Sequence, residues 1–251
     1  MHTSLSRAVA AAALVLALAS CGRKDVATVG TGNDRLIVSE LDGSQLAEAS
    51  LATAREYDAN GLTEDAIRQY ETARAANPKL RGISHRLMIL YGQTGDERAT
   101  DEEFQKALKE TPRNADLEND YGFFQQSLGR VDRAREQYTK AVLIDPKNRL
   151  AWSNLARLEA EERNYDAALS AWSNVVSEAE SHSNLGIYQA KNGDVEEAKR
   201  SLERALELNR TLQAPREVLR WLEEGGAERV REALAEGETG AAPAGAGHLA
   251  S

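Results

Sequence analysis

The sequence predicts an all-α protein made of repeated helix pairs, and three observations lead to this fold class. Aromatic residues make up 5% of the 251-residue chain, which is low for a β-sandwich or a β-barrel. Alanine, leucine, glutamate and arginine are frequent, and these residues favour helix. Residues of several kinds also recur every 34 positions, as the prolines Pro78, Pro112 and Pro146 do.

The first twenty residues have the pattern of an export signal. Arg7 precedes a stretch of small and apolar residues over 8–19. This stretch is too short to cross the core of a bilayer, because a spanning helix needs roughly 20 residues. A basic residue before a short apolar stretch is typical of a secretory signal peptide, which we assign to residues 1–20.

The one cysteine of the chain directly follows this signal. The segment Leu18-Ala19-Ser20-Cys21 resembles a bacterial lipobox, in which the cysteine thiol receives a diacylglyceryl group and the cysteine becomes the new N-terminus. The alternative is an ordinary signal peptide with an unrelated cysteine. In lipoproteins, a residue other than Asp after the cysteine permits transfer to the outer membrane. Gly22 therefore favours an outer-membrane lipoprotein that faces the periplasm, held through Cys21.

Residues 21–46 are expected to form a flexible tether between the lipid and the folded part, because they contain four glycines and little helical periodicity. Within this tether, Leu36-Ile37-Val38 can form a short strand.

The period of 34 residues organises the middle of the chain. An aromatic residue recurs at Tyr70, Phe104, Tyr138 and Trp172, and a small residue recurs at Ala66, Thr100, Ala134 and Ala168. Glycines recur at Gly61, Gly95 and Gly129. A fifth unit follows after a shortened step of 30 residues, with Gly193, Ala198, Leu202 and Ala205. Several residue classes that share one period indicate a repeat architecture.

This pattern resembles the tetratricopeptide repeat (TPR), which has two antiparallel helices per unit. The resemblance covers residues 47–212 and implies a right-handed superhelical solenoid of five helix-turn-helix repeats with a C-terminal capping helix. We place the repeats at 47–80, 81–114, 115–148, 149–178 and 179–212.

Each repeated residue type has a physical role in such a repeat. A small residue in the first helix, such as Gly122 or Gly186, lets the second helix approach closely, and Met88 departs from this pattern. A glycine then ends the helix in a left-handed conformation. The fourth repeat has Arg163-Asn164 at this turn, so either Asn164 takes the role of the glycine or the turn is strained. Proline ends the second helix, because the residue before it is disfavoured in the α region.

The joint between the fourth and fifth repeats lacks a proline and is four residues short, so we expect a tighter or distorted connection over 177–183. Capping helices are expected over 213–236, with an amphipathic segment at 215–223 that covers the exposed face of the fifth repeat. If this cap packs Trp221 inward, we expect a monomer. The Gly/Ala-rich tail at 237–251 is predicted to be disordered.

Composition and motifs argue against several functions. The net charge of -9 disfavours a nucleic-acid partner, which needs clustered Lys and Arg. One cysteine allows neither an intramolecular disulfide nor a cysteine-rich metal site. The sequence has no GxxxxGK phosphate loop, no GxSxG motif and no paired histidine motif. We therefore predict no catalytic residues, no metal, no cofactor and no small-molecule substrate.

The family resemblance implies a concave wall that is lined by the first helix of each repeat. Its inward-facing positions fall on ten residues of this chain: Arg55, His85, Ile89, Asn119, Phe123, Gln126, Ser153, Arg157, Ile187 and Lys191. Phe123 and Ile89 can hold an apolar side chain of a peptide, Arg55 and Arg157 can pair with its carboxylates, and Asn119 and Gln126 can bind its backbone.

Each of these assignments has an alternative. Phe123 can instead pack between helices, a role for which Phe124 competes, and both arginines can be plain surface residues. Some family members bind a C-terminal carboxylate through a Lys-Asn-Asn-Lys-Arg set. Only fragments of that set, Arg55 and Asn154, are present here, and they do not support that mode.

The predicted function is that of a lipid-anchored, non-catalytic scaffold that binds a protein or peptide in the bacterial cell envelope. Its layout is similar to that of TPR lipoproteins of type IV and Flp (Tad) pilus assembly, so the candidate partner is a secretin or a pilus component. The alternative is a general envelope assembly or structural factor, serving outer-membrane assembly, polysaccharide export or cell division. An enzyme is the third and least favoured class.

Overall fold

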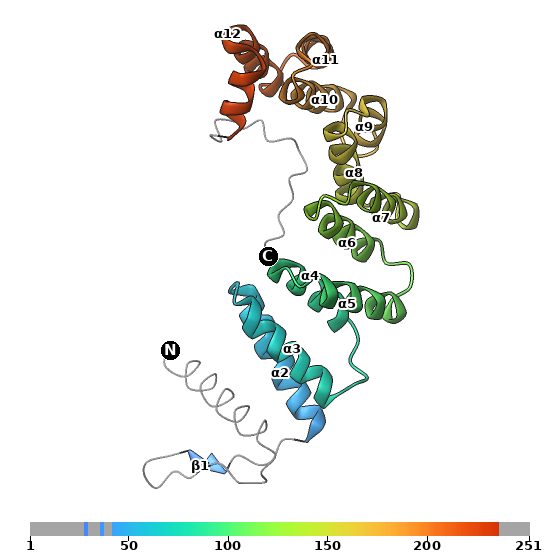
Figure 1. The fold of residues 1–251 in the computed structure, drawn as a ribbon, viewed down its shortest axis with the longest axis vertical. Coiled ribbons are helices and arrows are strands. Elements are labelled where there is room, and N and C mark those ends of the chain that lie inside the picture. Colours follow the sequence, from blue (N-terminus) through green and yellow to red (C-terminus); the bar gives the residue numbers. More distant parts are fainter. Residues whose placement is uncertain (1–27, 30–35, 38–41, 236–251) are drawn as a thin grey trace. The chain divides into compact units, whose positions relative to one another are not determined.

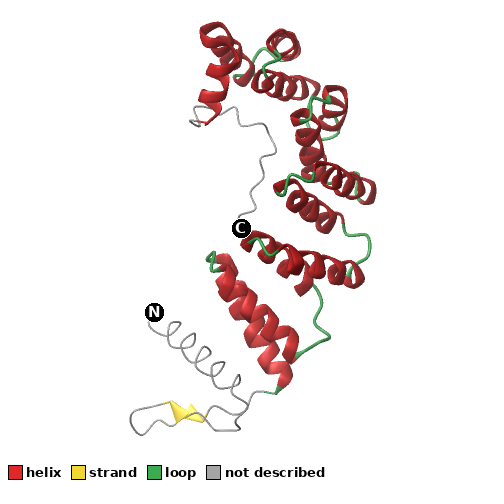
Figure 2. Cartoon of the chain, viewed as in Figure 1, coloured by secondary structure: helices red, strands yellow, loops and turns green. Residues whose placement is uncertain are grey.

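The computed structural model describes residues 28–29, 36–37 and 42–235 (Figure 1). This part of the chain is almost entirely helical (Figure 2). Its two short strands, β1 (Thr28–Val29) and β2 (Leu36–Ile37), pair antiparallel with Thr28 opposite Ile37. Strand β2 covers the first two residues of the strand predicted within the tether. The predicted signal peptide, Cys21 and the tail at 237–251 lie outside the described residues.

The chain divides into two compact units between Glu110 and Thr111. The helices of the first unit are α2 (Gly43–Ala59), α3 (Thr63–Ala76), α4 (Ile83–Thr94) and α5 (Glu97–Glu110). Helix α2 packs against α3, α3 against α4, and α4 against α5. Their apolar faces bury a core that includes Ala54, Tyr70 and Leu87.

The second unit continues the same pairing of helices. Its helices are α6 (Ala115–Ser127), α7 (Val131–Ile144), α8 (Arg149–Glu161), α9 (Tyr165–Trp172), α10 (Glu178–Asn192), α11 (Val195–Leu208) and α12 (Ala214–Ala235). Each odd-numbered helix packs against the helix before it, and α12 packs against both α10 and α11. The predicted all-α fold of five helix pairs and a C-terminal cap is confirmed.

The small residue of the first helix is required where two helices cross closely. A Cβ atom added at Gly186 would lie 2.6 Å from Cγ of Leu202, and one added at Gly122 would lie 2.8 Å from the ring of Tyr138. Both distances are shorter than carbon atoms tolerate. The glycines therefore set how closely α10 approaches α11, and how closely α6 approaches α7.

The turn inside each pair is left-handed in all five repeats, including the one that has no glycine. Gly129 has φ 70° and Gly193 has φ 90°, and Arg163 takes the same conformation with φ 62°. Asn164 does not replace the glycine. It has φ -81° and stands at the N-cap position of α9. The expected strain therefore falls on Arg163, for which a left-handed backbone costs roughly 1–2 kcal/mol.

Contacts from the next repeat hold Arg163 in this conformation. Its guanidinium donates to both carboxylate oxygens of Asp194, at 2.7 and 2.9 Å, and to the carbonyl oxygen of Asn192 at 2.5 Å. Tyr165 donates a short hydrogen bond to the same carboxylate. These bonds join the turn of the fourth repeat to the turn of the fifth.

The shortened step changes α9 and not the segment where we expected a distortion. Helix α9 has 8 residues, whereas α7 and α11 have 14 each. Residues 178–183 form the regular first turns of α10, which begins with a capping box between Ser177 and Glu180. The prediction of a distorted connection over 177–183 was wrong. Helix α9 ends early, at Trp172, and α10 then begins as a regular helix at Glu178.

The cap covers the last repeat as predicted. Helix α12 is kinked at Gly225 and Gly226, which have non-helical backbone angles. Val218, Trp221 and Leu222 join one core with residues of α10 and α11, and Trp221 is 1% exposed. Trp221 therefore packs inward, the arrangement for which we expect a monomer. None of the described helices is long and apolar enough to cross a membrane.

Candidate protein-interaction surface

Helices α6, α8 and α10 are the first helices of the last three repeats, and α8 contacts both of the others (Figure 1). Seven of the ten predicted groove residues lie on these helices, within the second unit. They are Asn119, Phe123 and Gln126 on α6, Ser153 and Arg157 on α8, and Ile187 and Lys191 on α10. We name this set of residues the α6–α8–α10 face.

The other three predicted groove residues belong to the first unit. Arg55 on α2 is exposed, and His85 and Ile89 on α4 are half-buried. Next to them, Arg86 forms an ion pair with Asp58 of α2, which also accepts a hydrogen bond from Tyr70 at 3.2 Å. This pair joins the first helices of the first two repeats.

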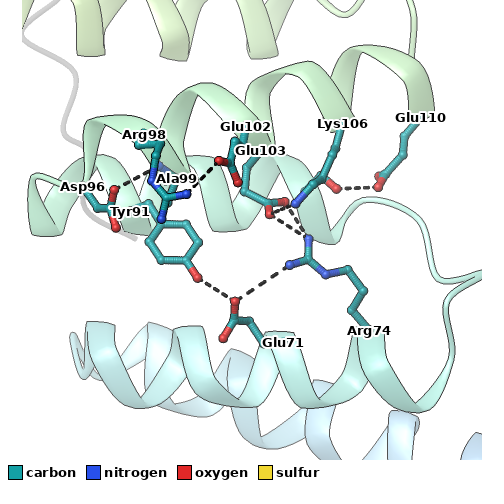
Figure 3. A network of polar contacts seen from close by, with 11 residues as sticks. Glu71, Arg74, Tyr91, Asp96, Arg98, Ala99, Glu102, Glu103, Lys106 and Glu110 are labelled. Atoms are coloured by element: carbon teal, nitrogen blue, oxygen red, sulfur yellow. Dashed lines mark hydrogen bonds and ion pairs between the residues drawn. The ribbon is translucent and has the colours of Figure 1, made fainter.

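A polar network also joins α3 to α4 and α5 (Figure 3). Arg74 on α3 donates to both carboxylate oxygens of Glu103 on α5, at 2.9 and 2.7 Å, and Lys106 donates to one of them. Tyr91 on α4 donates to Glu71 on α3 at 2.7 Å. Glu103 is buried, so the two cations compensate the cost of removing its charge from water. We assign this network a structural role in the joint between repeats.

The amides of the α6–α8–α10 face make hydrogen bonds within the protein. Asn154 of α8 donates to the side-chain oxygen of Asn119 at 2.8 Å, and Asn119 donates to Asp120 at 3.2 Å. Gln126 accepts from the hydroxyl of Tyr138 at 2.8 Å and donates to Glu161 of α8 at 3.0 Å. Asn119 and Gln126 therefore link neighbouring helices in this structure, whereas the sequence suggested that they bind a peptide backbone.

The apolar residues of the face differ in exposure. Phe123 is half-buried and packs against the core of Ala134, Tyr138 and Leu158, while Phe124 is buried. Phe124 thus fills the interior position, and part of the Phe123 ring stays accessible. Ile187 corrects the prediction, because it is 3% exposed and belongs to the core that α12 covers. The cap encloses this side chain, so it does not line a groove.

Arg157 is a cation of this face that forms no ion pair within the part of the chain that the structure describes. It is half-buried and donates to the side-chain oxygen of Asn154 at 3.2 Å. Among the described residues no carboxylate forms an ion pair with it. Burial raises the pKa of Tyr138 and of Tyr188. In both cases the negative charge of Glu161 adds to this effect and the positive charge of Arg157 opposes it, so both charged groups act on these hydroxyl groups.

Two further polar side chains near this face, Lys191 and Asn184, belong to α10. Nζ of Lys191 lies 5.5 Å from the ring centroid of Tyr188. Asn184 is 5% exposed, and its side-chain nitrogen is buried without a hydrogen-bond partner among the described residues. Sequence reasoning missed Asn184, although it follows Asn154 by the same shortened step of 30 residues. Ser153 is half-buried on α8.

We found no group of three or more His, Cys, Asp or Glu side chains that could hold a metal ion in the part of the chain that the structure describes.

Comparisons with known proteins agree with this architecture. Tetratricopeptide-repeat family models match residues 125–178 and 179–212. No curated protein matches the sequence.

Several solved structures share the fold. The structure of YrrB, titled a TPR protein with an unusual peptide-binding site, is 20% identical with a TM-score of 0.52, over 69% of this chain and 92% of its own. PilF of Pseudomonas aeruginosa is 18% identical with a TM-score of 0.52, over 77% and 99%. MamA from Desulfovibrio magneticus RS-1 is 17% identical with a TM-score of 0.55, over 67% and 97%. At these identities the likeness is one of fold.

Proposed function

We propose that this chain, in which tetratricopeptide-repeat models match residues 125–212, is a non-catalytic scaffold of the bacterial cell envelope. In this proposal a lipid on Cys21 holds the protein, which binds a protein or peptide and assists assembly of a pilus or secretion complex. TPR units in general are modules for protein–protein interaction. The proposal has three parts, namely the binding face, the lipid anchor and the pathway, and each has its own support.

The observation that carries the binding role is the accessible, unpaired part of the α6–α8–α10 face. Arg157 has no carboxylate partner among the described residues, Lys191 is exposed, and Phe123 of α6 is half-buried. Arginine and aromatic side chains are the residue types that often dominate binding energy at interfaces. The fold likeness to YrrB, whose title names a peptide-binding site, agrees with a peptide as the ligand.

The lipid anchor is supported by the sequence around Cys21. The short apolar stretch at 8–19, the small residues Ala19 and Ser20, and the position of the one cysteine all fit a lipobox. A single acyl chain binds a membrane only marginally, and stable anchoring needs at least two. A triacylated cysteine meets this need, and Gly22 favours the outer membrane facing the periplasm as the destination.

The pathway is supported by layout and by the fold likeness to PilF, a pilus-related TPR protein. A lipobox, five repeats and a short cap are the layout of TPR lipoproteins in pilus assembly, and the candidate partner is a secretin or a pilus component. Fold alone does not determine function, so the partner has to be found by experiment.

The deciding experiment is a pull-down from native membranes with the tagged full-length protein, compared with a Phe123→Glu, Arg157→Glu double variant. An Arg133→Glu variant is the matched control, because Arg133 is an exposed arginine on α7. Circular dichroism must show equal helicity for all three proteins. We expect one envelope protein to co-purify with the wild type and the control but not with the double variant. If the same partner survives the double variant, the binding site lies elsewhere.

The anchor and the pathway have separate readouts. We expect Cys21→Ser to move the protein from the membrane fraction to the soluble fraction, and unchanged fractionation argues against lipidation. Recovery of a secretin or pilus subunit supports the pilus proposal. Recovery of a polysaccharide-export, outer-membrane-assembly or division protein instead supports the general envelope role.

A further inference from the structure

The last turns of α12 form a separate helical segment that lies against α10. This segment comprises residues 227–235, which follow the kink of α12, and we name it the cap segment. Val230 and Ala233 of the cap segment are completely buried, and they share one core with Ile187 of α10. The cap segment therefore helps to cover a side chain that the sequence placed in the groove.

A polar contact fixes the cap segment at the C-terminal end of α10. Nε of Arg231 donates to the backbone carbonyl oxygen of Lys191 at 2.9 Å, and the same guanidinium pairs with Glu228 at 2.7 Å. The guanidinium carbon of Arg229 lies 6.0 Å from the ring centroid of Trp221, which precedes the kink. The contacts with α10 do not depend on the connection through the kink, so the cap segment of another copy of the chain can make them equally well.

The kink is a hinge of two glycines that holds α12 in its bent form. Gly226 has φ 65° and ψ -152°, angles that are essentially restricted to glycine. A Cβ atom added there would meet no atom within 4 Å, so the backbone conformation and not a lack of space requires glycine. With helical angles at Gly225 and Gly226, residues 214–235 would form one straight helix of about 33 Å. The cap segment would then no longer lie against α10.

A straight α12 would expose two complementary apolar surfaces, one on the cap segment and one at the end of α10. A second copy of the chain offers both surfaces, and exchange of an identical element restores the lost contacts. Short hinges under strain favour such an exchange. We propose that the end of α10 is a docking surface for a second copy, and that the chain forms a two-fold dimer in which each cap segment packs on α10 of the other copy. The monomer expected from the inward Trp221 is the closed form.

The first test is sedimentation equilibrium of the full chain in density-matched detergent. Gly226→Ala should disfavour the closed form about tenfold, because alanine does not tolerate the angles of the hinge. One dimer relieves two hinges, so its association constant should rise by the square of this factor, about a hundredfold. Gly129→Ala is the matched control, because Gly129 also has a left-handed backbone with φ 70° and free space for a Cβ atom. It should leave the association constant unchanged.

The second test is a cross-link that forms between two chains only when the cap segment is exchanged. One tagged chain carries Lys191→Cys and a differently tagged chain carries Arg231→Cys, the two positions that meet in the structure. Both also carry Cys21→Ser, which removes the one native cysteine. With Gly226→Ala in both chains, we expect a short bismaleimide to link them. With the unchanged hinge, the same link should appear at higher protein concentration.

A further variant excludes association through another surface. Val230→Asp places a charge in the core that receives the cap segment, so Gly226→Ala with Val230→Asp should be monomeric. The inference is wrong if this double variant still dimerises, or if Gly226→Ala associates no more strongly than the wild type. It is also wrong if neither hinge gives a link between chains at any concentration. None of these results depends on the proposed partner, anchor or pathway, which the pull-down and the fractionation decide separately.

Discussion

The hydroxyl of Tyr138 donates a 2.8 Å hydrogen bond to the side-chain oxygen of Gln126, twelve residues earlier in the chain. The first repeat has the same pair at the same spacing, with Tyr70 donating to Asp58 at 3.2 Å. The second and fourth repeats have Phe104 and Trp172 in place of the tyrosine, and Gly92 and Ala160 in place of the acceptor. The hydroxyl therefore occurs only in the repeats whose first helix supplies an acceptor for it.

This relationship predicts that exchanging tyrosine and phenylalanine destabilises the protein in either direction. Tyr138→Phe should lower the free energy of unfolding by about 1 kcal/mol, because one buried hydrogen bond is lost. Phe104→Tyr should also destabilise, by about 1–3 kcal/mol, because the new hydroxyl is buried opposite Gly92, which offers no side-chain acceptor. Urea unfolding followed by circular dichroism measures both. A neutral or stabilising Phe104→Tyr would show that the pairing has no energetic meaning.

The crossing of α10 and α11 predicts a steric coupling between two residues. Gly186→Ala should cost about 1–3 kcal/mol, because its methyl group would stand 2.6 Å from Cγ of Leu202. In a Leu202→Ala background the same substitution should cost much less, since the obstructing side chain is gone. Thermal unfolding of the two single variants and the double variant measures this coupling, and simple additivity of the two single effects would contradict the model of the crossing.

The left-handed turn at Arg163 predicts that glycine stabilises this position more than alanine does, the reverse of their order within a helix. Both Arg163→Gly and Arg163→Ala remove the contacts to Asp194, but only glycine adopts φ 62° without steric cost. The glycine variant should therefore be more stable than the alanine variant by about 1 kcal/mol. At the exposed helical residue Arg133 the order should be reversed by a similar amount. Urea midpoints of the four variants check this, and an alanine variant as stable as glycine at 163 would contradict it.

Glu118 on α6 predicts a pH dependence of stability. Burial raises the pKa of its carboxyl group above the ordinary 4.5, with Lys140 opposing the effect and Glu136 adding to it. The folded state therefore holds this proton more tightly than the unfolded state. Stability is retained below the ordinary pKa and is lost as pH rises through the folded pKa.

Glu118→Gln should accordingly raise the free energy of unfolding at pH 7. Its advantage over the wild type should shrink as the pH approaches 4, where the wild-type carboxyl is protonated in both states. Urea unfolding at several pH values between 4 and 8 measures this difference. A variant that is less stable than the wild type at pH 7 would show that the charged carboxylate is stabilised by its surroundings.

The periodic residues predicted the helix pairs well because their contacts are local. In a repeat array each unit touches only its neighbours, so a small residue such as Gly122 and its partner Tyr138 recur with the same meaning. The same argument predicted the cap, since the last repeat leaves an apolar face that Trp221 and Leu222 cover. The periodicity was less informative at the fourth repeat, where the step is four residues shorter. The sequence pattern does not show which part of the repeat lacks these four residues.

The sequence assigned the candidate residues to α6, α8 and α10, but it did not predict which of them are already engaged within the protein. The period indicates which positions face which helix and says nothing about which polar partners they find there. Gln126 was expected to bind a peptide and instead bonds to Tyr138 and Glu161. Ile187 was expected in the groove and instead lies in the core under α12.

The sequence by itself determined the helices, their pairing and the close crossings, because these follow from side-chain size at fixed spacing. Only the tertiary structure decided which polar groups remain unpaired. A hydrogen bond depends on the positions of two side chains, as between Asn119 and Asn154, which are 35 residues apart. A period that predicts the backbone does not predict which side chains meet in this way. Asn119 and Gln126 are engaged in bonds between helices, whereas Arg157 forms no ion pair with any described carboxylate.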